Sequence, residues 1–374
     1  MDNILTYIKW RGDLSFSNAP FQEVDNLVFA TLSYLRFSKV FQKTKKKSLT
    51  IKEASNLFFS LDEQRYRSEH DLTLLRMMAE SVRYGKVKIH SYVDHIDEEQ
   101  QKQFSALAFQ FHGSDTYVAY RGTDNTLIGW KEDFNMTFLD TIPSQLEAQE
   151  YLTKIAQHTH GALYVGGHSK GGNLAVYASA SVKEEIQHRI QAIYNNDGPG
   201  FNDSMLKREG YQRIVSKIHS YVPQSSVVGM LLNHEEEYHV VKSTQISLWQ
   251  HDPYSWQVMG AGFLTLTMVD TSSILMDKTM KNMLIKLTPE QRATFIDAMY
   301  DIFQSTNAKS LKELKENKLK NMTIIVKALN NIDPSTRKIM NETLSSFFLS
   351  MRKAIEEMSF STLSEISSTP DHVS

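Results

Sequence analysis

The most informative segment of the sequence is residues 162–180, ALYVGGHSKGGNLAVYASA. Its apolar start predicts a strand, its end predicts a helix, and GHSKG between them, at 167–171, predicts a sharp turn. Small residues two positions either side of Ser169 let the strand and the helix approach closely while the Ser169 Oγ projects into a cleft. The pattern therefore predicts a serine nucleophile at this turn.

A phosphate-binding loop is the main competing interpretation of a glycine-rich turn between a strand and a helix. Such a loop needs Lys and then Ser or Thr directly after its last glycine. Here Gly171 is followed by Gly172 and Asn173, so a phosphate-binding loop is excluded. A glycine-rich turn with an incidental serine remains the structural alternative.

The composition is that of an ordinary globular protein. The chain has 374 residues, 41% hydrophobic and 22% charged, enough for one large domain with an appendage or for two domains. Basic residues are scattered and the net charge is −2, so we expect no nucleic-acid partner. The chain has no cysteine, which excludes disulfides, thiolate metal sites and cysteine nucleophiles. Any nucleophile is therefore oxygen or nitrogen.

Neither a signal peptide nor a membrane span is visible in the sequence. The first residues lack a basic stretch followed by a long apolar core. No apolar run approaches the ~20 residues needed to cross a bilayer. We therefore expect a cytoplasmic protein without a transmembrane segment.

The spacing of apolar residues predicts three regions. Residues 1–100 are expected to form a helical cover, 101–269 an α/β core, and 270–374 a C-terminal helical region that serves as a lid or an interaction unit. The core contains a hairpin signal over 104–120 and an amphipathic helix at 144–159. Because strands alternate with helices, we expect an α/β fold with a mostly parallel sheet flanked by helices. The helices expected outside the core are 25–37, 50–59, 69–84, 279–286, 289–303, 310–330 and 335–358.

Three motifs carry a family resemblance: YRGT at 120–123, WKED at 130–133 and GHSKGGN at 167–173. They resemble the class 3 lipase branch of the α/β-hydrolases. The whole chain also looks like an uncharacterised bacterial family of lipase-like α/β-hydrolases, which NDGPGF at 196–201 and QHDP at 250–253 also resemble. The resemblance implies an α/β-hydrolase fold more firmly than it implies a substrate.

The resemblance also implies an oxyanion hole built from Thr123 and the backbone N–H of Lys170. A threonine that only caps the strand end is the alternative for Thr123. We expect Arg121 to pair with a carboxylate, such as that of Asp133, and so to hold this loop. The Lys170 side chain is expected to face solvent, with an acidic substrate as the alternative.

A serine hydroxyl is a weak nucleophile near neutral pH, so an imidazole must take its proton and a carboxylate must hold the imidazole. The fold orders these groups as Ser, acid, His along the chain. His251 lies in a loop-like segment near the end of the predicted sheet, where the fold places its base, and a surface or core histidine is the alternative. His234 and His239 flank three glutamates, which we interpret as a solvated acidic turn and not as a zinc site.

The acid is the departure from the class 3 pattern. The loop that carries the acid in that branch corresponds to 222–227 here, which contains no Asp or Glu. Asp197 follows the next predicted strand after Ser169 and is the expected acid. Asp252, beside the predicted base, and a Ser-His dyad without an acid remain alternatives.

We therefore expect a serine hydrolase of lipase, phospholipase or esterase type that cleaves a carboxylic ester or thioester through an acyl-enzyme on Ser169. Its substrate is a small-molecule ester or a lipid, peripheral lipid contact is left open, and no metal or organic cofactor is implied. Met268, Leu275 and Met276 are candidates for an apolar lid. Two alternatives stay open: an inactive hydrolase scaffold that binds a small molecule or a protein, and an interaction protein that uses its helical tail.

Overall fold

A mixed β-sheet organises the first of the two compact units into which the chain divides, Met1–Met268 and Val269–Ser374. The structure is a computed structural model of the protein. It describes residues 2–64, 66–124, 126–136, 139–270, 288–306, 318–343, 345 and 349. The described strands of the main sheet, in spatial order, are β1 (Ser48–Thr50), β2 (Lys88–Asp97), β3 (Lys102–His112), β4 (Asp115–Tyr120), β5 (Leu163–His168), β6 (Ile190–Asn196), β7 (Ile218–Pro223), β8 (Tyr238–Val241) and β11 (Thr265–Leu266).

The centre of this sheet is parallel and its edges are antiparallel. Strands β4 to β8 pair in parallel, whereas β1 to β4 and the pair β8 and β11 are antiparallel. A separate small sheet joins β9 (Val258–Met259) to β10 (Gly262–Phe263). The predicted α/β fold and the predicted hairpin of β3 and β4 are confirmed.

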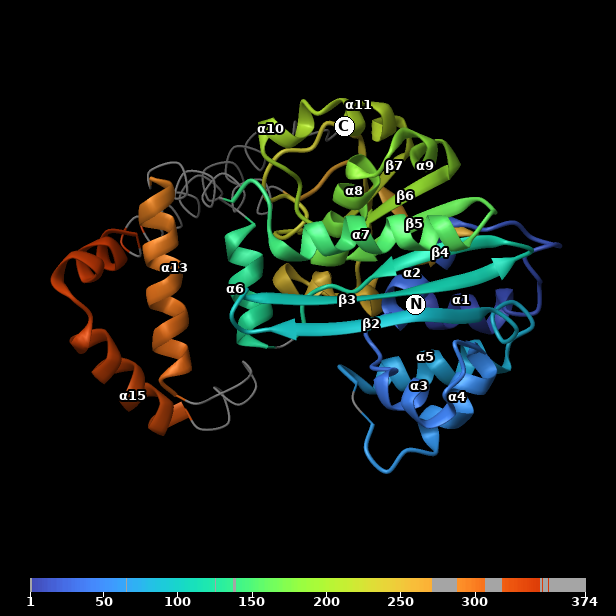
Figure 1. Ribbon diagram of the computed structural model, residues 1–374, viewed down its shortest axis with the longest axis horizontal. Coiled ribbons are helices and arrows are strands. Elements are labelled where there is room, and N and C mark those ends of the chain that lie inside the picture. The colour runs from blue at the N-terminus through green and yellow to red at the C-terminus, as the bar shows by residue number, and fades with distance from the viewer. Residues whose placement is uncertain are drawn as a thin grey trace, which may run out of the picture. The chain divides into compact units, whose positions relative to one another are not determined.

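Helices cover both faces of the sheet (Figure 1). One face carries α1 (Ile4–Arg11), α2 (Glu23–Leu32) and α5 (Glu69–Glu80), and the other carries α7 (Pro143–His158), α8 (Lys170–Ser181) and α11 (Glu209–Ile214). The remaining helical elements of this unit include α3 (Ser38–Thr44), α4 (Ile51–Phe59), α6 (Leu127–Asn135), α9 (Glu184–Arg189), α10 (Asp203–Leu206), η1 (Val215–Lys217), η2 (Ser247–His251) and η3 (Pro253–Ser255).

The two faces have separate apolar cores because successive strand residues point to opposite sides. On β3, Leu107 and Phe109 belong to the core under α2, whereas Ala106 and Ala108 belong to the core under α8. Burial on both faces makes the central strands almost continuously apolar. This pattern is the physical reason that the sequence signal for these strands is strong.

The first hundred residues are not wholly helical. Helices α4 and α5 lie in segments expected to be helical, and α2 overlaps the expected helix at 25–37. Thr50 caps α4 by accepting the Glu53 N–H at 3.1 Å. However, β1 and β2 also fall in this region and extend the sheet. In the described residues, no helix has both the length and the apolarity that a bilayer span requires.

The second unit contains α13 (Pro289–Gln304) and α15 (Lys318–Asn331), and Ala298, Ile302 and Met340 form its small apolar core. Both helices overlap segments predicted to be helical, and each ends one residue beyond the predicted end. The expected helix at 279–286 and the lid candidates Leu275 and Met276 fall outside the described residues, whereas Met268 is exposed.

Candidate active site

Ser169 lies on the sharp turn between β5 and α8. Its backbone φ of 59° and ψ of −135° is a conformation that residues with a side chain rarely adopt. A Cβ atom at Gly167 would lie 2.3 Å from the backbone carbon of Gly171, and one at Gly171 would lie 2.1 Å from the carbonyl oxygen of Tyr120. Both positions therefore need glycine, and the turn predicted around Ser169 is present.

His251 and Asp197 come together next to this turn. Asp197 directly follows β6, the parallel neighbour of β5, and His251 ends η2. The Nδ1 atom of His251 lies 2.6 Å from Oδ2 of Asp197. The His251 ring also packs against the ring of His168, the residue before Ser169, with centroids 4.5 Å apart. Ser169 and Asp197 thus follow adjacent parallel strands, and His251 contacts Asp197 and the residue before Ser169.

The second carboxylate oxygen of Asp197 is held from the loop after β7. Oδ1 accepts hydrogen bonds from the Ser226 hydroxyl and from the Gly229 N–H, the latter at 3.1 Å. The Asp197 N–H donates to the Tyr221 carbonyl at 2.8 Å. The segment 222–227, which lacks an acid, therefore supplies a donor to an acid from the neighbouring strand. Asp252, the alternative acid, instead caps η3 by accepting the N–H of Tyr254 at 3.2 Å.

The predicted oxyanion donors flank Ser169. A Cβ atom at Gly122 would lie 3.0 Å from the Ser169 Cβ, so the turn after β4 passes directly beside the nucleophile. Thr123 follows in this turn, and its Oγ1 donates to Oδ1 of Asp133 at 2.6 Å. Lys170 is the first residue of α8, and N–H groups at this end of a helix have no partner within the helix.

Asp133 has an unusual environment for a carboxylate. Burial raises its pKa to about 6, while the positive charge of Lys170 and the hydrogen bond from Thr123 act in the opposite direction. His251 also lowers this pKa, which places Asp133 within electrostatic reach of the predicted base. At neutral pH the carboxylate is mostly ionised and can accept the Thr123 hydroxyl.

A family model described as Mbeg1-like matches residues 78–301, more than half of the chain. The chain belongs to the Mbeg1-like family. The matched region contains all five predicted site residues. No curated protein matches the sequence.

Two solved structures are similar to this Mbeg1-like chain. A fungal lipase in complex with an inhibitor, described as a model for interfacial activation in lipases, is 12% identical with a TM-score of 0.38, over 59% of this chain and 78% of that chain. M37 lipase is 14% identical with a TM-score of 0.37, over 57% of this chain and 70% of that chain.

The prediction that the Lys170 side chain faces solvent is wrong. The side chain is 1% exposed, and its Nζ lies 2.7 Å from Oε2 of Glu132, which is fully buried on α6. The same Nζ donates to the Gln103 carbonyl on β3 at 3.0 Å. Burial of the ammonium group is tolerated because it contacts a carboxylate and a second acceptor.

Arg121 pairs with a carboxylate, as expected, but its partners are Asp94 and Asp124 and not the suggested Asp133. Nη2 of Arg121 lies 2.8 Å from Oδ1 of Asp94 on β2 and 3.9 Å from Oδ2 of Asp124. Arg36 pairs with Asp124 as well and lies 3.7 Å from Asp94. These two arginines and two carboxylates form a network of ion pairs that holds the turn after β4.

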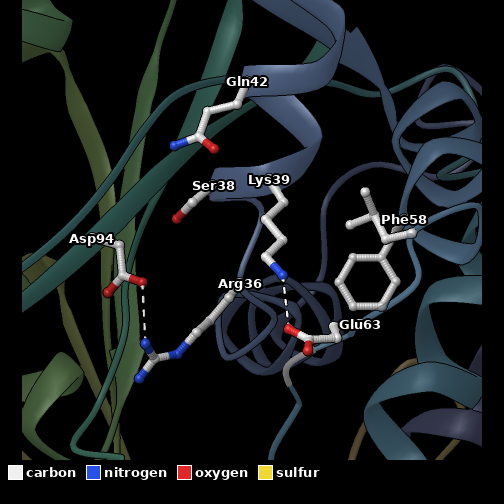
Figure 2. Close-up of a pocket in the computed structure, with 8 residues that line it drawn as sticks. Arg36, Ser38, Lys39, Gln42, Phe58, Glu63 and Asp94 are labelled. Carbon is white, nitrogen blue, oxygen red and sulfur yellow. Dashed lines mark hydrogen bonds and ion pairs between the residues drawn. The ribbon is translucent and has the colours of Figure 1, made fainter.

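Arg36 and Asp94 also line a cavity of about 240 Å³ beside α3 (Figure 2). Figure 2 shows Arg36 pointing toward Asp94 and Lys39 toward Glu63, and the Lys39 and Glu63 charges are 3.0 Å apart. Both cations on the cavity wall are thus engaged by carboxylates. We assign this cavity no part in the chemistry.

His168 has a role that the sequence did not reveal. Its Nδ1 accepts a hydrogen bond from the Tyr34 hydroxyl at 2.9 Å, and its Nε2 lies 2.7 Å from the His251 carbonyl oxygen, to which it donates. Burial lowers the pKa of His168 well below its usual range, so the ring is neutral. The neutral ring therefore ties the loop of the predicted base to the nucleophile turn.

Asn173 is a second residue whose role the sequence pattern does not reveal. Its Nδ2 donates to the carbonyl oxygens of Pro199 and Gly200 at 3.1 and 3.0 Å. It thereby fixes the loop that follows Asp197. The long-range partners of an amide side chain leave no local signal in the sequence.

The acidic run at 235–237 is not a wholly solvated turn. Glu236 is buried, and its carboxylate accepts hydrogen bonds from Ser220 and Tyr211 and pairs with Nδ1 of His234 at 2.9 Å. Although burial raises the pKa of Glu236, its hydrogen bonds, led by that of His234, bring it down to about 2. In the described part of the chain, no three His, Cys, Asp or Glu side chains gather as metal ligands.

Proposed function

We propose that this protein is a serine hydrolase that cleaves carboxylic esters or thioesters through an acyl-enzyme on Ser169. The observation that carries the proposal is the 2.6 Å contact between Nδ1 of His251 and Asp197, made beside a serine in a strained turn. A carboxylate on Nδ1 fixes the tautomer in which Nε2 is free to accept a proton. This is the arrangement that serine activation requires.

The roles of the residues follow from this geometry. Ser169 Oγ attacks the substrate carbonyl carbon and gives its proton to Nε2 of His251. The negative charge on the former carbonyl oxygen is stabilised by the N–H groups of Lys170 and Thr123. His251 then protonates the leaving alcohol or thiol, and water hydrolyses the acyl-enzyme by the reverse use of the same base.

The substrate class rests on the resemblance of the motifs to lipases, so lipids and other carboxylic esters are the compounds to test first. Lipase-like, phospholipase-like and simpler esterase substrates share the acyl ester, and they differ in chain length and head group. p-Nitrophenyl esters of graded chain length separate a short-chain esterase from a lipase-type enzyme.

The test is labelling of the full-length protein with a fluorophosphonate, followed by mass spectrometry to locate the adduct. We expect an adduct on Ser169 that is lost in Ser169→Ala and His251→Ala and weakened in Asp197→Ala. Folded wild-type protein that forms no adduct and hydrolyses no ester would overturn the proposal and favour a binding scaffold.

A further inference from the structure

We propose that the buried ion pair of Lys170 and Glu132 is a positioning device that holds the two halves of the oxyanion hole in register. This inference rests on the proposed function. Lys170 and Glu132 are positioning residues here through their side chains, while the backbone N–H of Lys170 is one of the two proposed donors.

The ion pair joins the elements that carry the two donors. The Lys170 side chain starts from the residue after Ser169 and crosses to α6, where its Nζ lies 2.7 Å from Oε2 of Glu132. The next residue of α6 is Asp133, whose Oδ1 is 3.9 Å from the same Nζ and accepts the Thr123 hydroxyl. One continuous chain of contacts therefore runs from one donor residue to the other.

The Glu132 carboxylate also accepts hydrogen bonds from two other elements. Its Oε2 accepts the Gln103 N–H from β3 at 3.0 Å, and its Oε1 accepts the N–H and the hydroxyl of Ser144 from α7 at 3.1 and 2.6 Å. The carboxylate thus lies where β3, α6, α7 and α8 meet. A helix of nine residues such as α6 is marginal by itself, so its placement depends on tertiary contacts like these.

Stability alone is a weak reason for a buried ion pair at this place. Desolvation of two charges offsets most of their attraction, and well-packed apolar residues often serve stability equally well. What the pair adds is a defined distance between two specific points of the backbone. Oxyanion donors need such definition, because their geometry must match the transition state.

The experiment measures turnover and transition-state binding in the full-length protein. Lys170→Met alone leaves the Glu132 carboxylate buried without a counter-ion and endangers folding. The primary variant is therefore Lys170→Met with Glu132→Gln, in which neither member of the ion pair is left charged without its partner. Each variant is assayed for kcat and KM with a soluble short-chain ester, for inhibition by a trifluoromethyl ketone, and for thermal unfolding.

We expect the double variant to lose ~10²-fold in kcat with KM changed less than ~3-fold, because a displaced oxyanion donor acts on the transition state. The trifluoromethyl ketone, which forms a tetrahedral adduct, should bind weaker by a similar factor. In a Thr123→Val background, the same double replacement should add less than ~3-fold, since both changes act through one network.

The matched control is Lys217→Met. Lys217 also donates to two backbone carbonyls, those of Gln187 and Ile190 at 2.9 and 2.7 Å. However, it lies at the amino ends of β6 and β7, whereas Ser169 and Asp197 follow the carboxyl ends of β5 and β6. It should affect thermal unfolding and leave kcat and ketone binding unchanged.

Chemical rescue gives a second readout. Because the chain has no cysteine, Lys170→Cys supplies a unique thiol that 2-bromoethylamine converts to a lysine analogue in the unfolded chain before refolding. Wild type carried through the same treatment is the reference. Recovery of kcat on aminoethylation supports the proposal.

Failure of the positioning role and failure of the proposed function give different results. A folded Lys170→Met, Glu132→Gln variant with wild-type kcat and wild-type ketone binding overturns the positioning role and leaves the proposed function standing. A wild-type protein that forms no Ser169 adduct and turns over no ester overturns the proposed function, and the positioning role with it.

Discussion

His251 Nδ1 contacts Asp197 Oδ2 at 2.6 Å across 54 residues of sequence. Because β5 and β6 are parallel neighbours, Ser169 and Asp197 leave the sheet at the same edge, and the hydrogen bond from His168 to the His251 carbonyl holds the imidazole-bearing loop there. The loop after β7 then fixes the carboxylate through Ser226 and Gly229. Asp197, and not the adjacent Asp252, therefore meets the imidazole.

Asp197→Asn should lower kcat by up to ~10⁴-fold, because an amide can hold the imidazole in the wrong tautomer, the effect known for the aspartate of serine proteases. Esterase kinetics on the folded variant measure this loss. Asp252→Asn is the control, since that side chain is half exposed and caps η3. Equal losses in the two variants, or an unchanged rate in Asp197→Asn, would favour a dyad.

The sequence predicted the elements whose signals are local. The turn at Ser169 combines a strand, glycines at fixed spacing and a helix within 19 residues, and the hairpin of β3 and β4 has alternating aromatic residues around a short turn. The order Ser, Asp, His along the chain limited the candidates for base and acid. The fold class and the candidate site residues could therefore be predicted from local sequence patterns and from the family resemblance.

Other features depended on contacts between distant segments. β2 is mostly exposed or half-buried, so its residues show little apolar alternation and no strand was predicted there. Without β2, its Asp94 could not be recognised as the partner of Arg121. Likewise, Lys170 was expected in solvent because nothing local reveals that α6 brings Glu132 to it.

Thr123→Val and Asp133→Asn should each lower kcat, by up to ~10²-fold, because the first removes and the second weakens the hydrogen bond that fixes the turn beside Ser169. Thr123→Ser keeps the hydroxyl and should stay within a few-fold of wild type. Because the two residues form one contact, the double variant should lose little more than the worse single variant. Fully additive losses would mean that they act separately.

Asp133→Asn should also change how stability depends on pH. The pKa of Asp133 is raised to about 6 in the folded protein, against ~3.9 for an unperturbed aspartate. Its contribution to stability is thus present below pH ~3.9 and is lost as pH rises through about 6. In urea unfolding, the free energy of unfolding of Asp133→Asn should therefore rise relative to that of wild type between pH 4 and 7. A difference in free energy that stays constant over this range would contradict the prediction.

His168→Gln should reduce the loss of stability on acidification. Burial keeps the pKa of His168 well below its usual range, so its contribution is present above pH ~6.5 and is lost as pH falls toward the folded-state pKa. The loss can reach about 1.4 kcal/mol per pH unit for one proton. Urea unfolding at pH 7 and 5 measures it, and the exposed His188→Gln is the control. Equal slopes in wild type and His168→Gln would contradict the prediction.

Asp25→Asn should lower the free energy of unfolding of the first unit by about 3 to 5 kcal/mol, the usual effect of breaking a buried ion pair. Asp25 and Arg83 are both fully buried, and Nε of Arg83 lies 2.7 Å from Oδ1 of Asp25. The exposed pair of Lys39 and Glu63 is the comparison, and Glu63→Gln should change stability by at most ~1 kcal/mol. Similar effects in both variants would mean that the Asp25 pair is not held as tightly as its geometry indicates.

Gly171→Ala should damage both stability and the nucleophile. An added Cβ would lie 2.1 Å from the Tyr120 carbonyl oxygen, and this backbone atom cannot move unless β4 moves. Overpacking of this kind typically destabilises by about 1 to 3 kcal/mol and occasionally by more. Gly113→Ala is the control, because its Cβ meets nothing within 4 Å and only its φ of 54° opposes the change, at about 1 to 2 kcal/mol.

The two variants separate packing from backbone conformation. Movement of β4 also shifts the turn beside Ser169, so Gly171→Ala should lose fluorophosphonate labelling even in the fraction that remains folded. Gly113→Ala, at the far end of the β3 and β4 hairpin, should keep it. If folded Gly171→Ala protein labels at the wild-type rate, the close approach of α8 to β4 is not what holds Ser169 in its strained conformation.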